Sequence, residues 1–365
     1  CKKHDTYYHR KRYRHLMFYH IKNIIIRTVV VPLLCVAMTA CSDDDGVGAI
    51  AKNDVRVAFT MMVADATSTR AANEGWDNYD PKQPGIEDEN MINTDDLRIA
   101  ICDGMGNIIG DVETITVTPM SDPSGTKYAI TGVWKNAKDD IARAKKIMIV
   151  ANCNATKLST IDLPDLKYNI DTETRKYIPM WGVAALPALT LGTQTDMTEQ
   201  IYLLRAMAKV KVEMRSDMAS YGYSIGSMHI NNYNTQGYCL PKNYNSANKT
   251  QEIRFDNSLN VLESRAASIG LTDGKATYIP EYDNTSTGAT PSTITVDLNR
   301  NGKHEGTYTL KFRNYDTDGK PTGTPYDIQR NHYYTFLIYK EDGKIIVSLH
   351  VRKWNKRIYD EDIIM

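Results

Sequence analysis

The stretch VRVAFTMMVADATSTRA, residues 55–71, decides the fold of this chain. Apolar side chains occupy every second position of its first part, at Val55, Val57, Phe59, Met61 and Val63. A period of two places these five side chains on one face of a β-strand. A polar loop, residues 65–69, follows and ends at Arg70, directly before Ala71. The pattern predicts a half-buried strand that is joined to the rest of the fold by a loop with one basic residue at its tip.

The composition of the whole chain indicates an all-β protein. The 365 residues carry no formal net charge and 24 % of them are charged, which excludes a strongly basic nucleic-acid-binding protein. We therefore expect no nucleic-acid partner. Tyr occurs 23 times, Val, Ile and Thr are common, and long helical periodicities are scarce. Such a composition is typical of strands.

Alternating or continuous apolar runs predict further strands along the chain. They lie at residues 97–101, 112–118, 128–133, 146–151, 227–230, 276–279, 293–298, 306–313, 331–339 and 344–353. Asn-Gly or Asp-Gly pairs at 301–302, 318–319 and 342–343 predict hairpin turns. Residues 257–268 are a candidate helix. Residues 201–214 alternate most clearly and predict one long strand, with its charged residues, Arg205 among them, on the solvent face.

This pattern predicts two antiparallel β-sandwich domains. We place the boundary before the long strand, because residues 192–200 are polar. The domains are then residues 71–199 and residues 200–365.

The N-terminal region indicates export from the cytoplasm. An apolar run at residues 24–40 ends in small residues directly before Cys41, which resembles the signal of a bacterial lipoprotein. On that resemblance Cys41 is the lipidated residue. The alternative is a transmembrane anchor, but the run is short for one and Arg27 interrupts it. Residues 1–41 are therefore expected to be an upstream extension and a signal peptide, and residues 42–70 a propeptide.

Several segments, taken in order, resemble those of the fimbrillins, the type V pilus subunits of Gram-negative anaerobes. They are the lipoprotein signal at Cys41, TRA at 69–71, the strand and Gly turn from 97, IMIVAN at 147–152, LRAMAKVKV at 204–212, YIPEY at 278–282, IQRNHYY at 328–334 and the stretch 351–354. Their order and spacing carry the resemblance. It implies two transthyretin-like β-sandwich domains.

The resemblance also implies a mechanism. A lipidated fimbrillin precursor reaches the outer membrane, where an arginine- or lysine-specific protease cuts the loop after the first strand. Carried over to this chain, the cut falls between Arg70 and Ala71 and removes Cys41 together with the strand at 55–63. A strand of another subunit then fills the groove, and a cell-surface pilus that supports adhesion grows. The implied partners are other pilin subunits, the outer membrane before processing, and receptors on host or bacterial surfaces.

The donor strand is expected near the C-terminal end of the sequence. Apolar residues recur there, first in alternation and then more irregularly. The candidates are Ile345, Val347, Leu349, Val351, Trp354, Ile358, Ile363 and Ile364. Acidic residues at 360–362 would have to lie at the rim of the groove, which leaves open whether the subunit belongs to the stalk or to the tip.

No pattern predicts an enzyme, a metal site or a cofactor. The histidines after Cys41 are far apart and lack a triad or HExxH spacing. Residues 297–302 match the start of a calcium loop, but Tyr308 occupies the last ligand position and an Asn-Gly turn explains the same residues. We therefore expect neither catalysis nor a cofactor.

The three cysteines after Cys41 are Cys102, Cys153 and Cys239. They show no metal-binding spacing, and an odd number argues against a full disulfide framework. Buried free thiols are the expected state, with a disulfide between Cys102 and Cys153 left open.

The alternative function is a surface lipoprotein that stays monomeric. A glycan-binding protein would gather its aromatic residues in one cleft, with Trp76, Trp134, Trp181 and Tyr221 as sugar platforms. An anchor subunit of a pilus would instead remain uncut at Arg70.

Overall fold

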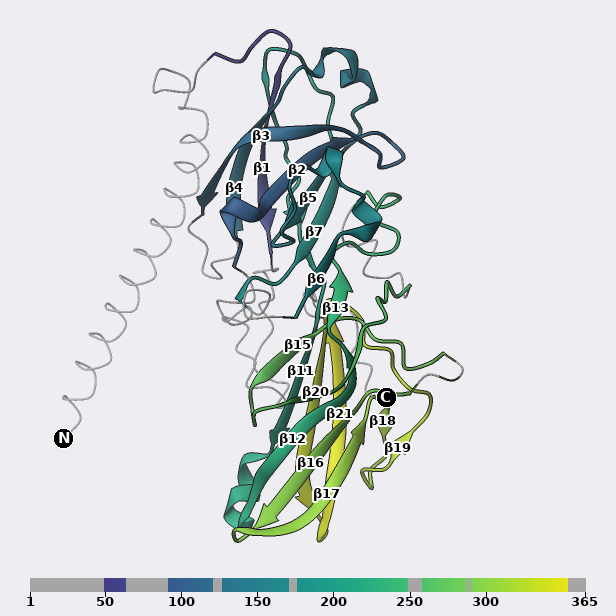
Figure 1. Ribbon diagram of the computed structural model, residues 1–365. Coiled ribbons are helices and arrows are strands. Elements are labelled where there is room, and N and C mark those ends of the chain that lie inside the picture. The colour runs from purple at the N-terminus through teal and green to yellow at the C-terminus, as the bar shows by residue number, and fades with distance from the viewer. Residues whose placement is uncertain are drawn as a thin grey trace, which may run out of the picture. The chain divides into compact units, whose positions relative to one another are not determined.

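The structure is a computed structural model that describes residues 49–63, 91–120, 127–170, 176–248, 258–286, 288 and 290–353, with only the backbone of residues 352 and 353. The chain divides into two units, Cys1–Ala49 and Ile50–Met365. The described residues of the second unit form strands β1–β21 with short 3₁₀ helices η1–η6 between them, which confirms the all-β prediction (Figure 1). None of the helices among the described residues is long and apolar enough to cross a membrane.

The first half of the unit is built on one nine-stranded sheet. Its order is β10-β7-β5-β2-β3-β4-β1-β8, and β9 pairs with β1. The strands are β1 (Val55–Met62), β2 (Leu97–Cys102), β3 (Ile108–Pro119), β4 (Lys127–Trp134), β5 (Lys146–Ala151), β7 (Met180–Ala185), β8 (Gln194–Asp196), β9 (Ile201–Tyr202) and β10 (Leu204–Arg205). The 3₁₀ helices on this half are η1 (Thr94–Asp96), η2 (Ala137–Asp139), η3 (Ile141–Arg143), η4 (Leu158–Thr160) and η5 (Leu163–Asp165).

The centre of this sheet is apolar on both faces. All six residues of β5 are buried, as are most residues of β2 and β7, which explains their continuous apolar sequences. These strands contribute to one hydrophobic cluster, the first core, to which the inward side chains of β1 also belong.

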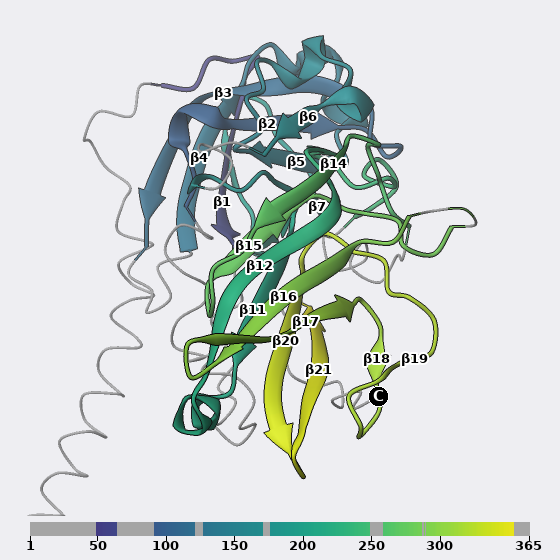
Figure 2. The ribbon, with the colours of Figure 1, turned by 60° about the horizontal axis from the view of Figure 1, so that its bottom comes forward.

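The second half of the unit contains two four-stranded sheets, which can be followed in Figures 1 and 2. One has the order β15 (Ala276–Ile279), β11 (Ala208–Met214), β20 (His332–Glu341), β21 (Lys344–Lys353), and the other the order β14 (Arg265–Gly270), β12 (Tyr223–Asn234), β16 (Thr293–Arg300), β17 (Lys303–Lys311). The helix η6 (Ser216–Tyr221) precedes β12. Alternate residues of both sheets, such as Val210, Phe336 and Val296, meet in a second cluster, the second core.

Residues 201–214 form three strands instead of the single predicted one. β9 pairs with β1, β10 pairs with β7, and only β11 pairs in the second half. The expected solvent face also fails, because Arg205 is 1 % exposed and Lys209 is 8 % exposed. Alternation predicts on which face of a strand a side chain lies. It does not identify the partner strand or what covers that face.

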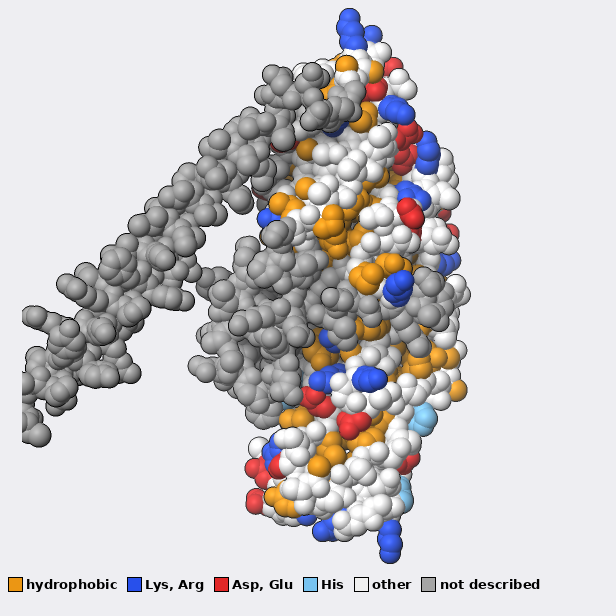
Figure 3. Space-filling model, turned by 90° about the vertical axis from the view of Figure 1, so that its left-hand side faces the viewer, with side chains coloured by type: hydrophobic (Ala, Val, Ile, Leu, Met, Phe, Trp, Pro, Cys, Tyr) orange, Lys and Arg blue, Asp and Glu red, His pale blue; other side chains and the backbone are white. Residues whose placement is uncertain are grey.

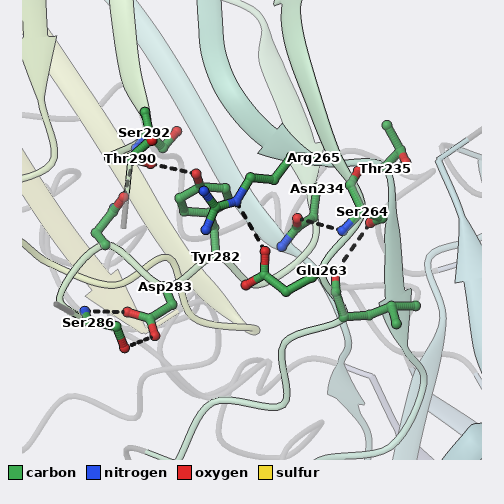
Figure 4. A network of polar contacts seen from close by, with 12 residues as sticks. Asn234, Thr235, Glu263, Ser264, Arg265, Tyr282, Asp283, Ser286, Thr290 and Ser292 are labelled. Carbon is green, nitrogen blue, oxygen red and sulfur yellow. Dashed lines mark hydrogen bonds and ion pairs between the residues drawn. The ribbon is translucent and has the colours of Figure 1, made fainter. Parts of the chain in front are cut away.

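The candidate helix at 257–268 is wrong, because its described part is extended and ends in β14. Ser264 ties this segment to the end of β12: its N–H donates to Asn234 Oδ1 at 3.1 Å, and its carbonyl accepts from Thr235 N at 3.1 Å. Figure 4 shows these contacts beside the Arg265–Glu263 ion pair. Backbone pairing with β12 therefore sets the conformation of this segment.

Turn residues behave as predicted where two-residue hairpins are needed. Asn301-Gly302 joins β16 to β17 and Asp342-Gly343 joins β20 to β21, all four with positive φ. Two consecutive positive φ angles define the turn that suits twisted hairpins. Asp318-Gly319 also lies in a hairpin, in the longer loop between the antiparallel strands β18 (Asn314–Tyr315) and β19 (Pro321–Thr322).

A buried ion pair connects segments that are far apart in the sequence. Arg330 Nη2 lies 2.8 Å from Glu281 Oε2, and the two side chains are 8 % and 4 % exposed. Arg330 also donates to the carbonyls of Tyr238 and Cys239, at 3.1 and 3.2 Å. Tyr238 is the last residue of β13 (Gln236–Tyr238), and Cys239 follows it; β13 pairs with β6 (Lys167–Asn169) from the first half.

The charge of Arg330 is maintained in this buried position. Burial alone would lower the pKa of Arg330, but the Glu281 carboxylate beside it raises that pKa above the ordinary value. No pattern in the sequence predicts this pair, although Glu281 lies in the segment YIPEY and Arg330 in IQRNHYY. Glu281 is the one charged residue in YIPEY, whereas Arg330 lies among polar residues in IQRNHYY, so the sequence marks only one member of the pair.

Candidate functional site

The strand β1 is fully built into the first core. Its inward side chains are Val55, Val57, Phe59 and Met61, and Val63 follows the end of the strand on the same side. Each of the five is at most 5 % exposed, as the alternation predicts. Figure 1 shows β1, in purple, within the first sheet.

Both edges of β1 are hydrogen-bonded. On one side β1 runs antiparallel to β4, with Val55 opposite Trp134 and Met62 opposite Lys127. On the other side it runs parallel to β8 and β9. Bonds on this second side include Arg56 N to Thr193 O at 3.0 Å and Leu203 N to Met62 O at 2.9 Å. Removing β1 would therefore leave two separate rows of backbone groups unpaired and open the first core.

The residues that precede β1 are also held. Asp54 Oδ1 accepts from Asn136 N at 3.0 Å, and Gly192 N donates to Asp54 O at 2.7 Å. Ala137 N donates to Asn53 O at 2.8 Å. The whole stretch 53–63 therefore behaves as one element of the first sheet.

Three residues on which the predicted processing depends lie outside the described residues. They are Cys41, Arg70 and Ala71. The structure describes the strand between the predicted lipid and the predicted cut, but neither of those two sites.

The predicted donor residues divide into two groups. Ile345, Val347, Leu349 and Val351 lie on β21, which pairs with β20 from Lys344 to Lys353. Val347 belongs to the second core, with Ile345 and Leu349 packed against it, whereas Val351 is 39 % exposed. The remaining candidates, Trp354, Ile358, Ile363 and Ile364, lie outside the described residues.

The aromatic residues that a glycan-binding protein would use do not share one cleft. Trp134 and Trp181 are buried in the first core, at 3 % and 0 % exposure. Tyr221 is 51 % exposed in η6, and Lys340 lies over its ring at 5.5 Å. Trp76 lies outside the described residues. The two buried tryptophans can therefore be excluded as sugar platforms.

The candidate calcium loop is a hairpin turn. Asp297 lies in β16 and accepts from Ser227 Oγ and Thr307 Oγ1, both at 2.5 Å, while Asn301-Gly302 forms the turn. Hydrogen bonds from both hydroxyls lower the pKa of Asp297. Across the part of the chain that the structure describes, no three His, Cys, Asp or Glu side chains converge on a metal-sized site.

The face of the molecule drawn in Figure 3 shows hydrophobic side chains in several separate patches among polar ones, with basic and acidic side chains intermixed. Among the described residues, the large hydrophobic side chains recorded as exposed are Met105, Tyr221 and Val351. Most of the apolar surface of the described residues therefore lies inside the two cores. In the first core, the apolar side chains that contact β1 are covered by that one strand.

A family model described as "Fimbrillin-A associated anchor proteins Mfa1 and Mfa2" matches residues 79–360. No curated protein matches. Among solved structures, the C-terminally truncated tip fimbrial protein Mfa3 from Porphyromonas gingivalis is similar with a TM-score of 0.51 and 13 % identity, covering 82 % of this chain and all of that one. A fimbrilin, FimA, from the same organism reaches a TM-score of 0.47 with 12 % identity over 84 % of this chain and 98 % of that one.

At sequence identities this low, structural similarity shows only a shared fold. Of the two structures, Mfa3 is the one that supports a shared fold with this chain. The family match spans most of the sequence and includes every described strand after β1. The fimbrillin resemblance inferred from the ordered segments is confirmed. The chain belongs to the family of fimbrillin-A associated anchor proteins Mfa1 and Mfa2.

Proposed function

We propose that this chain is a fimbrial subunit in which β1 is an exchangeable strand. The chain is exported as a lipoprotein on Cys41, cut between Arg70 and Ala71, and polymerised when a strand of another subunit takes the place of β1. One observation carries the proposal: β1 and the adjoining Val63 supply five buried side chains to the first core, and β1 is hydrogen-bonded along both edges.

The free energy gained by burying the apolar face of such a strand is large enough to drive assembly. Fully burying five apolar side chains contributes on the order of 8–15 kcal/mol, as an upper estimate. That is similar to the whole stability of an ordinary domain, roughly 5–15 kcal/mol. A subunit without β1 therefore cannot keep an open groove. It must take up another strand or lose its packing.

The geometry defines what the incoming strand must look like. In the direction of β1, it would run antiparallel to β4 and parallel to β8 and β9. It needs five alternating apolar side chains, with small β-branched residues at the first two positions and a large one at the site of Phe59. Addition of one strand per subunit, head to tail, gives an open filament.

We propose that the donor strand of this chain lies after β21. Donation of Ile345, Val347, Leu349 and Val351 would require β21 to separate from β20 along ten residue pairs and expose part of the second core. A donor that includes Trp354, Ile358, Ile363 and Ile364 avoids that cost. Its partner is another pilin subunit, and the assembled fimbrium supports adhesion at the cell surface.

A second candidate function is that of the anchor subunit, which keeps β1 and its lipid. The matched family is described as one of anchor proteins, which favours this candidate. An anchor would stay in the outer membrane as the base of the fimbrium and would accept no incoming strand, because its groove remains filled. The two candidates differ in one event, the cut at Arg70.

Limited proteolysis with an arginine-specific protease separates the two. The purified full chain should be cut once, giving Ala71-Ala72-Asn73 as the new N-terminus, and the product should form ladders on a native gel. Arg70→Ala should stay uncut and monomeric. Arg56 provides an internal control, because it lies within β1 and should be protected. Resistance at Arg70 with a stable, lipid-bearing monomer would overturn the exchange proposal and favour the anchor.

A further inference from the structure

One segment from the second half of the unit is built into the first core. Residues 236–247, which we call the clasp, begin at β13, between β12 and β14 in the chain. Cys239, Leu240 and Ala247 of the clasp belong to the first core, at 0 %, 2 % and 4 % exposure. The strands on either side of it, β12 and β14, pair with each other in the second half. The chain therefore leaves the second half, fills part of the first core and returns.

The start of the clasp is hydrogen-bonded to the first half. β13 runs antiparallel to β6, and the two strands lie side by side (Figure 1). Just before β13, Thr235 O accepts from Ile170 N at 2.8 Å. Just after β13, Cys239 N donates to Leu166 O at 2.8 Å. Backbone pairing therefore fixes the register of the clasp on the first half.

Close packing at Gly237 also ties the clasp to β6. A Cβ on Gly237 would lie 2.4 Å from the phenol oxygen of Tyr168, the residue opposite it. Tyr168 is 7 % exposed, and its hydroxyl donates to Ala206 O at 2.9 Å. The ring therefore cannot move aside without breaking that bond. Because Gly237 does not have a positive φ, this contact alone demands a glycine.

The end of the clasp is held by a buried cation. Lys146, the first residue of β5, is 5 % exposed, and its Nζ donates to Asn245 O at 3.2 Å and to Ser246 O at 3.5 Å. The turn after β2 lies against the same place, since a Cβ on Gly106 would be 2.2 Å from Asn245 O. Burying an ammonium group is costly unless acceptors replace water around it. The two carbonyls of the clasp supply those acceptors.

The second half of the unit holds the same segment from its other side. The buried Arg330 guanidinium donates to the carbonyls of Tyr238 and Cys239, at 3.1 and 3.2 Å. Asn260 Nδ2 donates to Leu240 O at 2.8 Å. Displacing the clasp would leave these groups without their partners, which is costly for a buried guanidinium. The packing of each half therefore depends on the clasp.

We propose that the clasp makes the two halves one cooperative folding unit, so that neither half loses its core without the other. Opening of the first core would release the apolar side chains of the clasp and, with them, the carbonyls that Arg330 binds. Loss of packing in one half is thereby transmitted to the other. In the polymer of the proposed function, tension that enters one half would reach the other through the clasp. The clasp is present in the uncut chain, so it can be tested independently of the cut at Arg70.

Native-state hydrogen exchange of the purified full chain tests the cooperativity. Mass spectrometry follows the slowest-exchanging amides of β5, in the first core, and of β16, in the second. Met61→Ala removes a fully buried side chain of the first core and should lower the protection of both strands by the same factor, about 30-fold or more. The milder Ile99→Val, with an expected loss of roughly 2- to 12-fold, replaces it if Met61→Ala does not fold. Loss of protection in β5 alone overturns the proposal.

Two glycine variants test whether the clasp is the link between the halves. Gly237→Ala should force β13 away from β6 and, combined with Ile99→Val, should confine the loss of protection to β5. Gly270→Ala in β14 is the matched control, because nothing lies within 4 Å of a Cβ at that position. Combined with Ile99→Val, it should leave the loss shared by β5 and β16. A shared loss in both double variants overturns the role of the clasp.

A second pair of variants takes the place of Gly237→Ala if that chain does not fold. Lys146→Met keeps the apolar stem but removes the donor to the two carbonyls of the clasp. Exchange of the amides in residues 241–248 should become about tenfold faster or more, since hydrogen bonds from a charged donor are lost. Lys145→Met, at the exposed neighbouring position, should leave that exchange unchanged. Equal exchange in the two variants means that Lys146 does not hold the clasp and overturns the proposal.

Discussion

The strands β1 and β21 show the same pattern in the sequence but occupy opposite situations in the fold. Each alternates apolar and other residues, and each sends its alternate side chains into a hydrophobic core. β1 is paired on both edges, whereas β21 is paired with β20 alone and ends its sheet. The inward residues of β1 are at most 5 % exposed, but Val351 on β21 is 39 % exposed.

A neighbouring loop partly shields the free edge of β21. Lys344 Nζ forms an ion pair with Asp318 at 3.0 Å, and Gly319 packs so tightly that a Cβ on it would lie 2.8 Å from Val347 N. Coverage of an edge by a loop is one of the ways in which proteins avoid unwanted strand pairing. The contribution of an alternating strand to stability therefore depends on its position in the sheet. The sequence pattern does not indicate that position.

The largest expected effect comes from placing a charge in each strand. Val57→Asp should lower the free energy of unfolding by about 4–5 kcal/mol or more, because an unpaired carboxylate would replace a fully buried side chain. Val351→Asp on β21 should change it by less than about 1 kcal/mol. Urea unfolding followed by fluorescence measures both. Equal losses of unfolding free energy would show that β21 is as deeply buried as β1, and the contrast between the two strands would not hold.

A smaller but still large effect is expected at the buried ion pair. Glu281→Gln should cost about 3–5 kcal/mol, because it leaves the Arg330 guanidinium buried without a counter-charge. Replacing both residues by Met should recover much of that loss, since no uncompensated charge remains. Asp318→Asn, which breaks the exposed pair with Lys344, should leave the urea midpoint unchanged. If the double Met variant is no more stable than Glu281→Gln, the loss comes from packing and not from charge.

Much of the fold was predictable because its strands carry strong local patterns. The alternation in β1 and β21 and the continuous apolar runs of β5 and β20 all correspond to observed strands. Asn301-Gly302 and Asp342-Gly343 form the expected turns, since few other residues tolerate two consecutive positive φ angles.

What the sequence did not reveal depends on long-range contacts. β8 is three residues long and polar, so nothing local marks Gln194–Asp196 as a partner of β1. Arg205 lies on an alternating segment yet is buried by its surroundings. Glu281 and Arg330 are 49 positions apart in the sequence. No periodicity predicts which of several charged residues will meet.

The smallest effect is expected at the surface of the first sheet. Glu113 in β3 contacts Lys157 and Lys135, each at 2.9 Å. Hydrogen bonds from Lys157 and Lys135 lower the pKa of Glu113 to about 2. Because this folded-state pKa lies below the unfolded value of 4.5, the pair stabilises the fold above pH 4.5 and loses that contribution as the pH falls towards 2. Glu113→Gln should lower the thermal midpoint slightly at pH 7 and not at pH 2, and added salt should reduce the difference. NMR titration of the Glu113 carboxyl measures the pKa directly, and a value near 4.5 would show that the two lysines do not hold the carboxylate in solution.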